Sequence, residues 1–325
     1  MLIATVCLLT GILFFLKDSK LKKLLLQDKV VVITGGTQGL GLAIAKECVK
    51  RKAKVVLISR RTIDPLSEEG LKDGCVESLS ADVTNPSDLE KAFSTIISNS
   101  EFGKIDVLIA SAGLSRSART EDLPFQQIQS QIDVNTLGVM NAVRAALPIL
   151  KSQNTNSRIA IISSVAGQIG LWGMSAYCAS KFALRGFADA LGMELEGSNT
   201  AVTIIYPPDM NTPGLATENL TKPEAISALA DEVEPDSIVP GIVNAVENGQ
   251  TDHSIGIDGW FATRVTAGLG PTNSFLNLFF EVFFGGVMRL IALVYRKVIR
   301  YTINKCEREL EKKSKIHQPA EKTDF

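Results

Sequence analysis

The segment from Val30 to Cys48 constrains the fold more than any other part of the chain. Val30–Ile33 is an apolar run of the length of a buried strand, and Leu42–Cys48 has the pattern of a helix. Between them lies a glycine-rich turn, Thr34-Gly35-Gly36-Thr37-Gln38-Gly39-Leu40-Gly41. A strand, a tight glycine turn and a helix form the first unit of a parallel sheet covered by helices.

The same alternation continues along the chain. Short apolar runs predict strands at Lys29–Ile33, Lys54–Ser59, Val76–Ser80, Val107–Ala110, Arg158–Ser163, Ala201–Tyr206 and Ser254–Ile257. The segments between them predict helices at Leu40–Arg51, Pro86–Ser98, Phe125–Lys151, Ser175–Glu196 and Pro235–Asn248. We therefore expect an α/β fold with a doubly wound parallel seven-stranded sheet (Rossmann), helices on both faces, and ligands at the carboxyl ends of the strands.

The glycine turn is suited to binding the pyrophosphate of a dinucleotide. Glycines let the backbone approach phosphates, and the N-terminus of the following helix supplies N–H donors and a partial positive charge. The spacing of Gly35, Gly39 and Gly41 differs from the Gly-x-Gly-x-x-Gly motif by one displaced glycine. The turn contains no Gly-Lys-Ser/Thr sequence, so it is not a P-loop. The alternative is a glycine-rich turn that only packs a helix on a sheet.

A second motif points to proton-transfer chemistry. Tyr177 and Lys181 lie four residues apart on one face of a predicted helix, and Ser164 precedes the tyrosine by thirteen residues. An ammonium group near a phenol favours the phenolate, which lets the tyrosine exchange a proton near neutral pH. The Ser164 hydroxyl can hold a substrate oxygen. Ser163 is the alternative, and because neighbours at a strand end point to opposite sides, only one of the two serines should matter.

Together these motifs resemble the short-chain dehydrogenase/reductase family, over roughly Asp28 to Phe261. The resemblance implies hydride transfer between a nicotinamide cofactor and a ketone, with Tyr177 as proton donor and Ser164 bound to the ketone oxygen. It further implies that Lys181 holds the nicotinamide ribose and that Asn135 supports a water that links Lys181 to solvent. A core amide that bends its helix is the alternative for Asn135.

The same resemblance implies the residues that contact the cofactor. They are Gly35, Thr37, Gln38, Gly39, Leu40, Gly41, Arg60, Arg61, Asp82, Val83, Ser111, Ala112, Gly113, Tyr177, Lys181, Pro207 and Thr212. Asp82 is expected to hold the adenine amino group, and a helix-capping role is its alternative.

The end of the second predicted strand, Ile58-Ser59-Arg60-Arg61, favours NADPH over NADH. An acidic residue at this place would bind the ribose hydroxyls of NADH and repel a 2′-phosphate, whereas a guanidinium can bind that phosphate through two hydrogen bonds. We expect Arg60 to be the main contact. The alternative is that both arginines are solvated and that Asp64 binds the ribose of NAD.

Charge and cysteine usage narrow the class of protein. The 325 residues have a net charge of -1, which argues against nucleic acid as a partner. The five cysteines form no C-x-x-C, and neither of the two histidines has a metal-spaced partner. We therefore expect reduced cysteines, no metal site and a catalytic body on the cytosolic side.

The N-terminal apolar run, Met1–Leu16, is followed by a cluster of lysines. We expect residues 1–26 to be an uncleaved membrane anchor with a basic flank, and a cleaved signal peptide is the alternative. Basic residues on the C-terminal side of the run place the catalytic domain, residues 27–262, in the cytosol. A helix this short suits a thin bilayer such as the endoplasmic reticulum membrane.

A second apolar stretch, Phe275–Tyr295, carries a polar stripe of Asn277, Glu281, Gly285 and Arg289, one every four residues. Cations follow it directly, and a single crossing would move them to the lumen, against the positive-inside tendency. We expect residues 263–300 to be membrane-associated, as an interfacial helix or as a hairpin that bends at Gly285, and residues 301–325 to be a polar tail. An amphipathic dimer helix is the alternative.

Two segments, Gly170–Gly173 and Tyr206–Gly214, resemble family members that act on long-chain lipids. The implied reaction is NADPH-dependent reduction of 3-ketodihydrosphingosine to dihydrosphingosine, a step of sphingolipid biosynthesis at the endoplasmic reticulum membrane. Family analogy also implies a homo-oligomer. The remaining alternatives are a membrane-bound steroid or retinoid reductase or dehydrogenase, and a non-catalytic NADPH-binding scaffold.

Overall fold

The structure is a computed structural model that describes residues 21–219, 232–268, 270–272 and 274–316. Most of the expected N-terminal anchor, residues 1–20, and the end of the expected polar tail lie outside the described residues.

A single seven-stranded parallel sheet forms the body, with the strand order β3-β2-β1-β4-β5-β6-β7. The strands are β1 (Val30–Thr34), β2 (Lys54–Ser59), β3 (Val76–Ser80), β4 (Val107–Ala110), β5 (Ser157–Ile162), β6 (Thr200–Tyr206) and β7 (Asp252–Ser254). The order reverses between β1 and β4, and a crevice forms at such a point at the carboxyl ends of the strands. The predicted doubly wound sheet is therefore confirmed.

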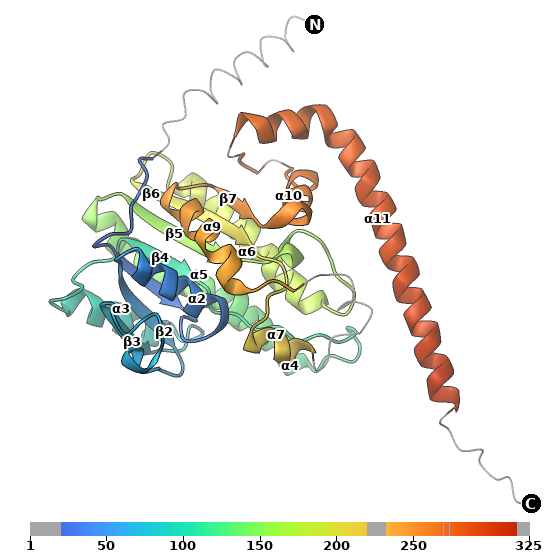
Figure 1. Cartoon of the computed structure of the whole chain (residues 1–325), viewed down its shortest axis with the longest axis horizontal. Coiled ribbons are helices and arrows are strands. Elements are labelled where there is room, and N and C mark those ends of the chain that lie inside the picture. The colour runs from blue at the N-terminus through green and yellow to red at the C-terminus, as the bar shows by residue number, and fades with distance from the viewer. Residues whose placement is uncertain (1–20, 220–231, 269, 273, 317–325) are drawn as a thin grey trace, which may run out of the picture.

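Helices cover both faces of this sheet (Figure 1). They are α2 (Gly39–Lys50), α3 (Pro86–Ser98), α4 (Phe125–Ile132), α5 (Gly138–Gln153), α6 (Ser175–Glu194), α7 (Pro213–Asn219), α9 (Pro235–Glu247), α10 (Gly256–Val265) and α11 (Phe275–Ile316). A π-helical turn, Asp133–Leu137, joins α4 to α5, and short 3-10 turns lie at Pro65–Ser67 and Val165–Gly167.

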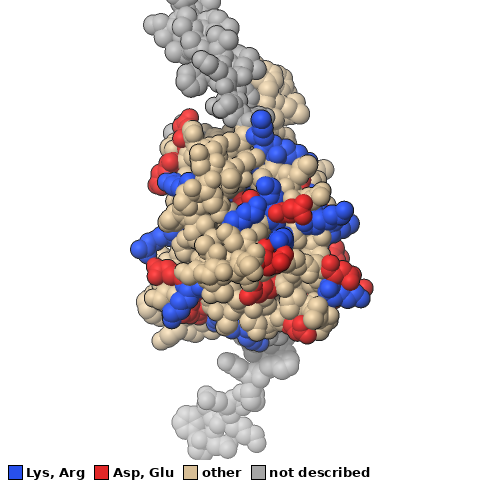
Figure 2. Space-filling model, turned by 90° about the vertical axis from the view of Figure 1, so that its left-hand side faces the viewer, with Lys and Arg blue, Asp and Glu red and all other residues tan. Residues whose placement is uncertain are grey.

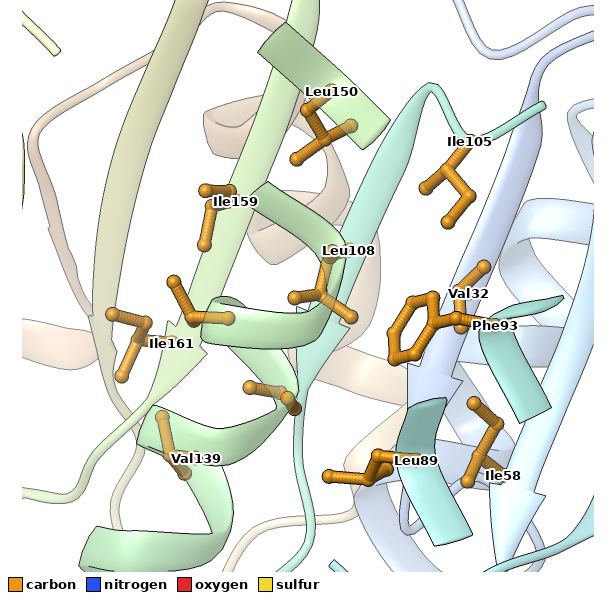
Figure 3. Packing of buried hydrophobic residues seen from close by; sticks show 14 of the residues in the cluster. Val32, Ile58, Leu89, Phe93, Ile105, Leu108, Val139, Leu150, Ile159 and Ile161 are labelled. Atoms are coloured by element: carbon orange, nitrogen blue, oxygen red, sulfur yellow. The ribbon is translucent and has the colours of Figure 1, made fainter. Parts of the chain in front are cut away.

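Alternation along the strands builds two cores. Val30 and Val32 of β1 pack in the cluster that includes residues of α3, α5 and α6, whereas Val31 and Ile33 pack with residues of α2 and α9. This is the period of two that a strand covered on both faces requires. Figure 3 shows the first cluster, with strand residues such as Leu108 facing side chains of α3 and α5. On the outer face drawn in Figure 2, cationic and anionic side chains are interspersed.

The residues just before β1 pack against the body of the domain. Leu24 and Leu26 are 3% and 2% exposed and belong to the core, while Leu25 between them is exposed. The Lys22 carbonyl accepts hydrogen bonds from Arg158 and Asn156, at 2.7 and 2.8 Å. Residues 22–26, which the sequence assigns to the basic flank of the anchor, therefore pack against the body.

The C-terminal part of the domain also differs from expectation. β7 occupies Asp252–Ser254 instead of Ser254–Ile257, and the chain turns at Gly256, with φ +74°, into the unpredicted α10. α11 is one continuous helix to Ile316, so the hairpin considered at Gly285 is wrong, and the helix continues into the expected polar tail.

α11 attaches to the body through its polar stripe. The buried Arg264 guanidinium of α10 donates to Glu281 at 2.7 Å and to Asp252 at 2.9 Å. The Trp260 indole donates to Asn277 at 3.3 Å. The polar residues at the start of the stripe therefore face α10, and the apolar residues point outward, as in Leu276, Phe283, Val287, Leu290, Val294 and Val298. In Figure 1, α11 reaches beyond the body.

Candidate active site

The glycine turn after β1 lies against the loop after β4. Gly35 has φ +69°, and a Cβ there would lie 2.7 Å from the Ala112 Cα. A Cβ on Gly41 would overlap the Gly35 carbonyl. The Gly35 N–H donates to the Ile58 carbonyl of β2 at 2.7 Å. Two of the predicted glycines are thus required by the close approach of backbone segments at the strand crevice.

The N-terminus of α2 opens next to this turn. Gln38 precedes the helix in an extended conformation, and its side chain does not cap the helix. The Thr212 side chain lies next to the first residue of this helix, since a Cβ on Gly39 would lie 3.4 Å from the Thr212 Cβ. An uncapped helix N-terminus beside a glycine turn offers N–H donors to an anionic phosphate, so these residues fit a nicotinamide dinucleotide.

Ser164 and Tyr177 face each other at the carboxyl edge of the sheet. The Ser164 hydroxyl follows β5, accepts a hydrogen bond from the Ala166 N–H at 3.1 Å and also bonds to the Tyr177 phenol. Ser163, 2% exposed, instead donates to the Lys181 carbonyl at 3.0 Å. The two neighbouring serines therefore point to different sides, and Ser164 is the one beside the tyrosine.

Lys181 occupies the same face of α6 as Tyr177. Its ammonium lies 5.8 Å from the centre of the Tyr177 ring and donates to the Ile162 carbonyl at 2.9 Å. The side chain is buried, and this burial lowers the lysine pKa to about 8. The ammonium is thus bound to the end of β5, a contact that the sequence did not predict; its expected roles, holding the nicotinamide ribose and favouring proton exchange by the phenol, stay predictions.

The Tyr177 phenol is protonated at neutral pH in this arrangement. Burial raises the pKa of Tyr177, the carboxylate of Glu218 raises it further, and the Ser164 hydrogen bond lowers it. A protonated phenol is the form that can donate a proton to a ketone oxygen.

Asn135 sits in the π-helical turn and is completely buried. Its amide donates to the Leu114 carbonyl and to the Ser180 hydroxyl at 2.8 and 2.9 Å, and it accepts from the Leu114 N–H at 2.8 Å. A Cβ on Gly113 would lie 3.4 Å from the Asn135 oxygen and 3.5 Å from the Lys181 nitrogen. The amide thus joins the loop after β4 to α6 next to the lysine, and helix bulges of this kind recur at functional sites.

The residues expected around the adenosine lie at the ends of β2 and β3. Arg60 and Arg61 are exposed directly after β2. Asp64 accepts from the Leu66 N–H at 3.0 Å and so caps a short turn. Asp82 accepts from the N–H and hydroxyl of Thr84 at 2.9 and 2.8 Å, and it therefore shapes its own loop.

The other predicted cofactor contacts also gather at this edge. Gly113, Ser111 and Ala112 follow β4, buried Pro207 follows β6, and Val83 packs beside Gly138 of α5. Thr37 and Leu40 belong to the glycine turn and the first turn of α2.

Sequence reasoning missed two acidic residues. Glu218 of α7 is buried, and both it and Asp209 act electrostatically on the Tyr177 phenol. An acidic residue in a polar segment is ordinarily solvated. Only the burial of Glu218 in α7 distinguishes it from a solvated acid, so its effect on the Tyr177 phenol was not predicted from the sequence.

The chain belongs to the short-chain dehydrogenase family, whose model matches residues 29–223, and it is an oxidoreductase of that family. It is 34% identical over 310 residues to a bovine protein named 3-ketodihydrosphingosine reductase, covering 92% of each chain. It is also 35% identical to a zebrafish (Danio rerio) protein named 3-dehydrosphinganine reductase, covering 88% of each chain.

A solved structure supports the fold. Ligand-free aldohexose dehydrogenase from Thermoplasma acidophilum superposes with a TM-score of 0.60 at 24% identity, over 70% of this chain and 92% of that one. Together with the family assignment, this fold implies a nicotinamide cofactor.

Proposed function

We propose that this chain reduces 3-ketodihydrosphingosine to dihydrosphingosine with NADPH. The observation that carries this proposal is the pairing of Ser164 with Tyr177 and Lys181 beside the glycine turn. This site lies in a chain similar over about nine-tenths of its length to reductases named for that substrate.

A nicotinamide dinucleotide held at the glycine turn and the N-terminus of α2 would supply the hydride for the ketone carbon. Tyr177, kept protonated by burial, gives its proton to the ketone oxygen as negative charge develops there. Ser164 holds the same oxygen in place by a hydrogen bond.

Two further residues support the return of a proton to the Tyr177 phenol. Lys181, whose pKa is about 8, can return a proton toward the phenol at neutral pH. Asn135 fixes the loop and helix on either side of the lysine and so keeps it next to the tyrosine.

The preference for NADPH rests on Arg60. Its position at the end of β2 and the absence of an acid there suit a 2′-phosphate. Asp64, the competing candidate for NAD, already caps a turn. Asp82 remains the proposed adenine contact.

We place the enzyme on the endoplasmic reticulum membrane with its body in the cytosol. Among the described residues, one helix, Phe275–Lys305, is long and apolar enough to cross a bilayer, and only 6% of its most apolar stretch is buried. Because Glu281 and Asn277 bind the body, the free apolar face of α11 points away from it. A lipid surface would cover that face and deliver a long-chain ketone directly. Homo-oligomer formation stays a prediction.

A product assay tests this function. Purified protein with NADPH is offered 3-ketodihydrosphingosine, a steroid ketone and retinaldehyde, and the alcohols are quantified by mass spectrometry. We expect dihydrosphingosine as the dominant product. Faster turnover of the steroid or retinoid would refute the assignment, and no turnover of any ketone would indicate a non-catalytic scaffold.

A further inference from the structure

The turn that carries Ser164 ends at a buried glutamine. Ser164 begins the 3-10 turn Val165–Gly167 and Gln168 ends it. The Gly167 N–H donates to the Ser164 carbonyl at 2.8 Å, and the Gln168 N–H donates to the Val165 carbonyl at 2.9 Å. These bonds join the residues of the turn into one unit, so a displacement of Gln168 also moves Ser164. Gln168 is only 3% exposed, although glutamine side chains are mostly exposed in folded proteins.

The Gln168 side chain is bound to α10. Its Nε2 donates to the Thr263 hydroxyl at 2.6 Å, in a buried hydrogen bond between positions 95 residues apart. The Thr263 hydroxyl gives its single hydrogen to the Gly259 carbonyl at 2.9 Å, so it acts toward Gln168 as the acceptor. The serine turn is therefore tied through one side-chain contact to a helix that lies outside the predicted active site.

α10 is itself fixed to the sheet and to the helix of the catalytic tyrosine. Arg264, the neighbour of Thr263, donates to Asp252 of β7 at 2.9 Å. Arg185 of α6 donates to the Ala267 carbonyl, just after α10, at 2.6 Å. Because Arg185 lies four residues after Lys181, one turn further along the same helix, α10 contacts both elements that carry the proposed catalytic residues.

Two other contacts hold the beginning and the middle of the serine turn. The Val165 N–H donates to the Pro207 carbonyl at 3.1 Å. A Cβ on Gly167 would lie 2.9 Å from the Lys181 carbonyl oxygen, so the turn lies directly against α6. The contact between Gln168 and Thr263 fixes the remaining end. This matters for the reaction because a misplacement of about 1 Å can cost on the order of 10²-fold in rate.

We propose that Gln168 and Thr263 are positioning residues for the reduction. Their hydrogen bond holds the turn so that the Ser164 hydroxyl stays beside the Tyr177 phenol and both reach the same ketone oxygen. This inference rests on the proposed function, to which it adds two residues that act through Ser164 without touching the substrate.

The test removes the Thr263 hydroxyl in the full-length protein and measures reduction of 3-ketodihydrosphingosine by NADPH. The concentration of binding sites is titrated by NADPH fluorescence, and kcat is expressed per site. For Thr263→Val we expect kcat to fall by ~10-fold, the scale of one buried hydrogen bond, while NADPH binds as in the wild type. Thr263→Ser keeps the hydroxyl and should restore kcat to within about twofold of the wild type.

A double-mutant cycle separates positioning from general loss of stability. Gln168→Met removes the other partner of the hydrogen bond at similar length. If the bond itself positions Ser164, then Gln168→Met, Thr263→Val and the double variant should have the same kcat per site. Independent effects on folding would instead multiply in the double variant.

Thr266→Val is the matched control. The Thr266 hydroxyl donates to the Ala262 carbonyl at 2.8 Å, which repeats the bond from Thr263 to Gly259 one turn later in the same region. Its replacement removes the same kind of intrahelical bond, and we expect kcat to stay at the wild-type value.

Several results would overturn the inference while leaving the proposed function intact. They are a wild-type kcat for Thr263→Val, equal losses in Thr263→Ser and Thr263→Val, multiplied losses in the double variant, or an equal loss in Thr266→Val. Weaker NADPH binding by Thr263→Val would also overturn it, because the contact would then serve the cofactor site. A wild type that does not reduce 3-ketodihydrosphingosine refutes the proposed function, and this inference with it.

Discussion

Replacing Lys181 by methionine should make the protein more stable at neutral pH while abolishing its activity. Methionine has nearly the length of lysine and carries no charge to bury. The folded protein lowers the lysine pKa from 10.5 to about 8, which corresponds to ~3 kcal/mol of unfavourable free energy for the charged form. The hydrogen bond to the Ile162 carbonyl returns ~1–2 kcal/mol of this. We therefore expect Lys181→Met to raise the free energy of unfolding by ~1–2 kcal/mol at pH 7.

The pH dependence gives the sharper test. Between pH 8 and 10.5 the unfolded chain still binds the lysine proton and the folded chain has released it, so wild-type stability rises with pH relative to the variant. The advantage of methionine is complete below pH 8 and declines through this window; above 10.5 the charge penalty is gone, and the wild type should be the more stable protein by the ~1–2 kcal/mol of its hydrogen bond.

The measurement is urea unfolding of both proteins in the same detergent, without cofactor, from pH 7 upward. Lys50→Met is the matched control, because the Lys50 side chain is 81% exposed and its replacement should give a difference that does not vary with pH. A Lys181→Met variant that is less stable than the wild type at pH 7, or a difference that stays constant up to pH 10.5, would refute the reasoning.

Three further results are expected. Tyr177→Phe should lower kcat by ~10²-fold or more with NADPH binding retained, and near-normal turnover would exclude this phenol as proton donor. Arg60→Asp should change the ratio of kcat/KM for NADPH over NADH by ~10²-fold toward NADH, and an unchanged ratio would reject Arg60 as the phosphate contact. Arg264→Leu leaves Glu281 partly buried without this cation, removes one ion pair from Asp252, and should destabilise the α10–α11 junction by ~3–5 kcal/mol. Faster amide exchange confined to α10 and the first turns of α11 would show this, and unchanged exchange there would contradict it.

Most of the sheet could be predicted because its strands are apolar on both faces. Val30–Thr34 and Val107–Ala110 read as short buried runs, and no helix of that length would be stable. β7 was misplaced because Asp252-His253-Ser254 carries no apolar pattern, and only its backbone pairing with β6 makes it a strand. The helix α10 that follows was not predicted either, because its start depends on the turn at Gly256.

The active site was predictable in its spacing but not in its electrostatics. The offset of thirteen residues from Ser164 to Tyr177 identifies the pair, because both positions are set by local structure. The hydrogen-bond partner of the Lys181 ammonium could not be predicted from the sequence, because the Ile162 carbonyl comes close only when β5 packs on α6. The π-helical turn around Asn135 likewise depends on contacts with Leu114 and Ser180, which are distant in sequence.

The way the chain enters the fold limits how the body can move at a membrane. The Lys22 carbonyl accepts hydrogen bonds from the side chains of Asn156 and Arg158 at the start of β5, and the Leu24 N–H donates to the Glu247 carbonyl at 2.8 Å. Leu24 and Leu26 are then fixed inside the core. Because residues 22–26 are held in this way, they add no length to the connection between the body and any membrane segment ahead of them.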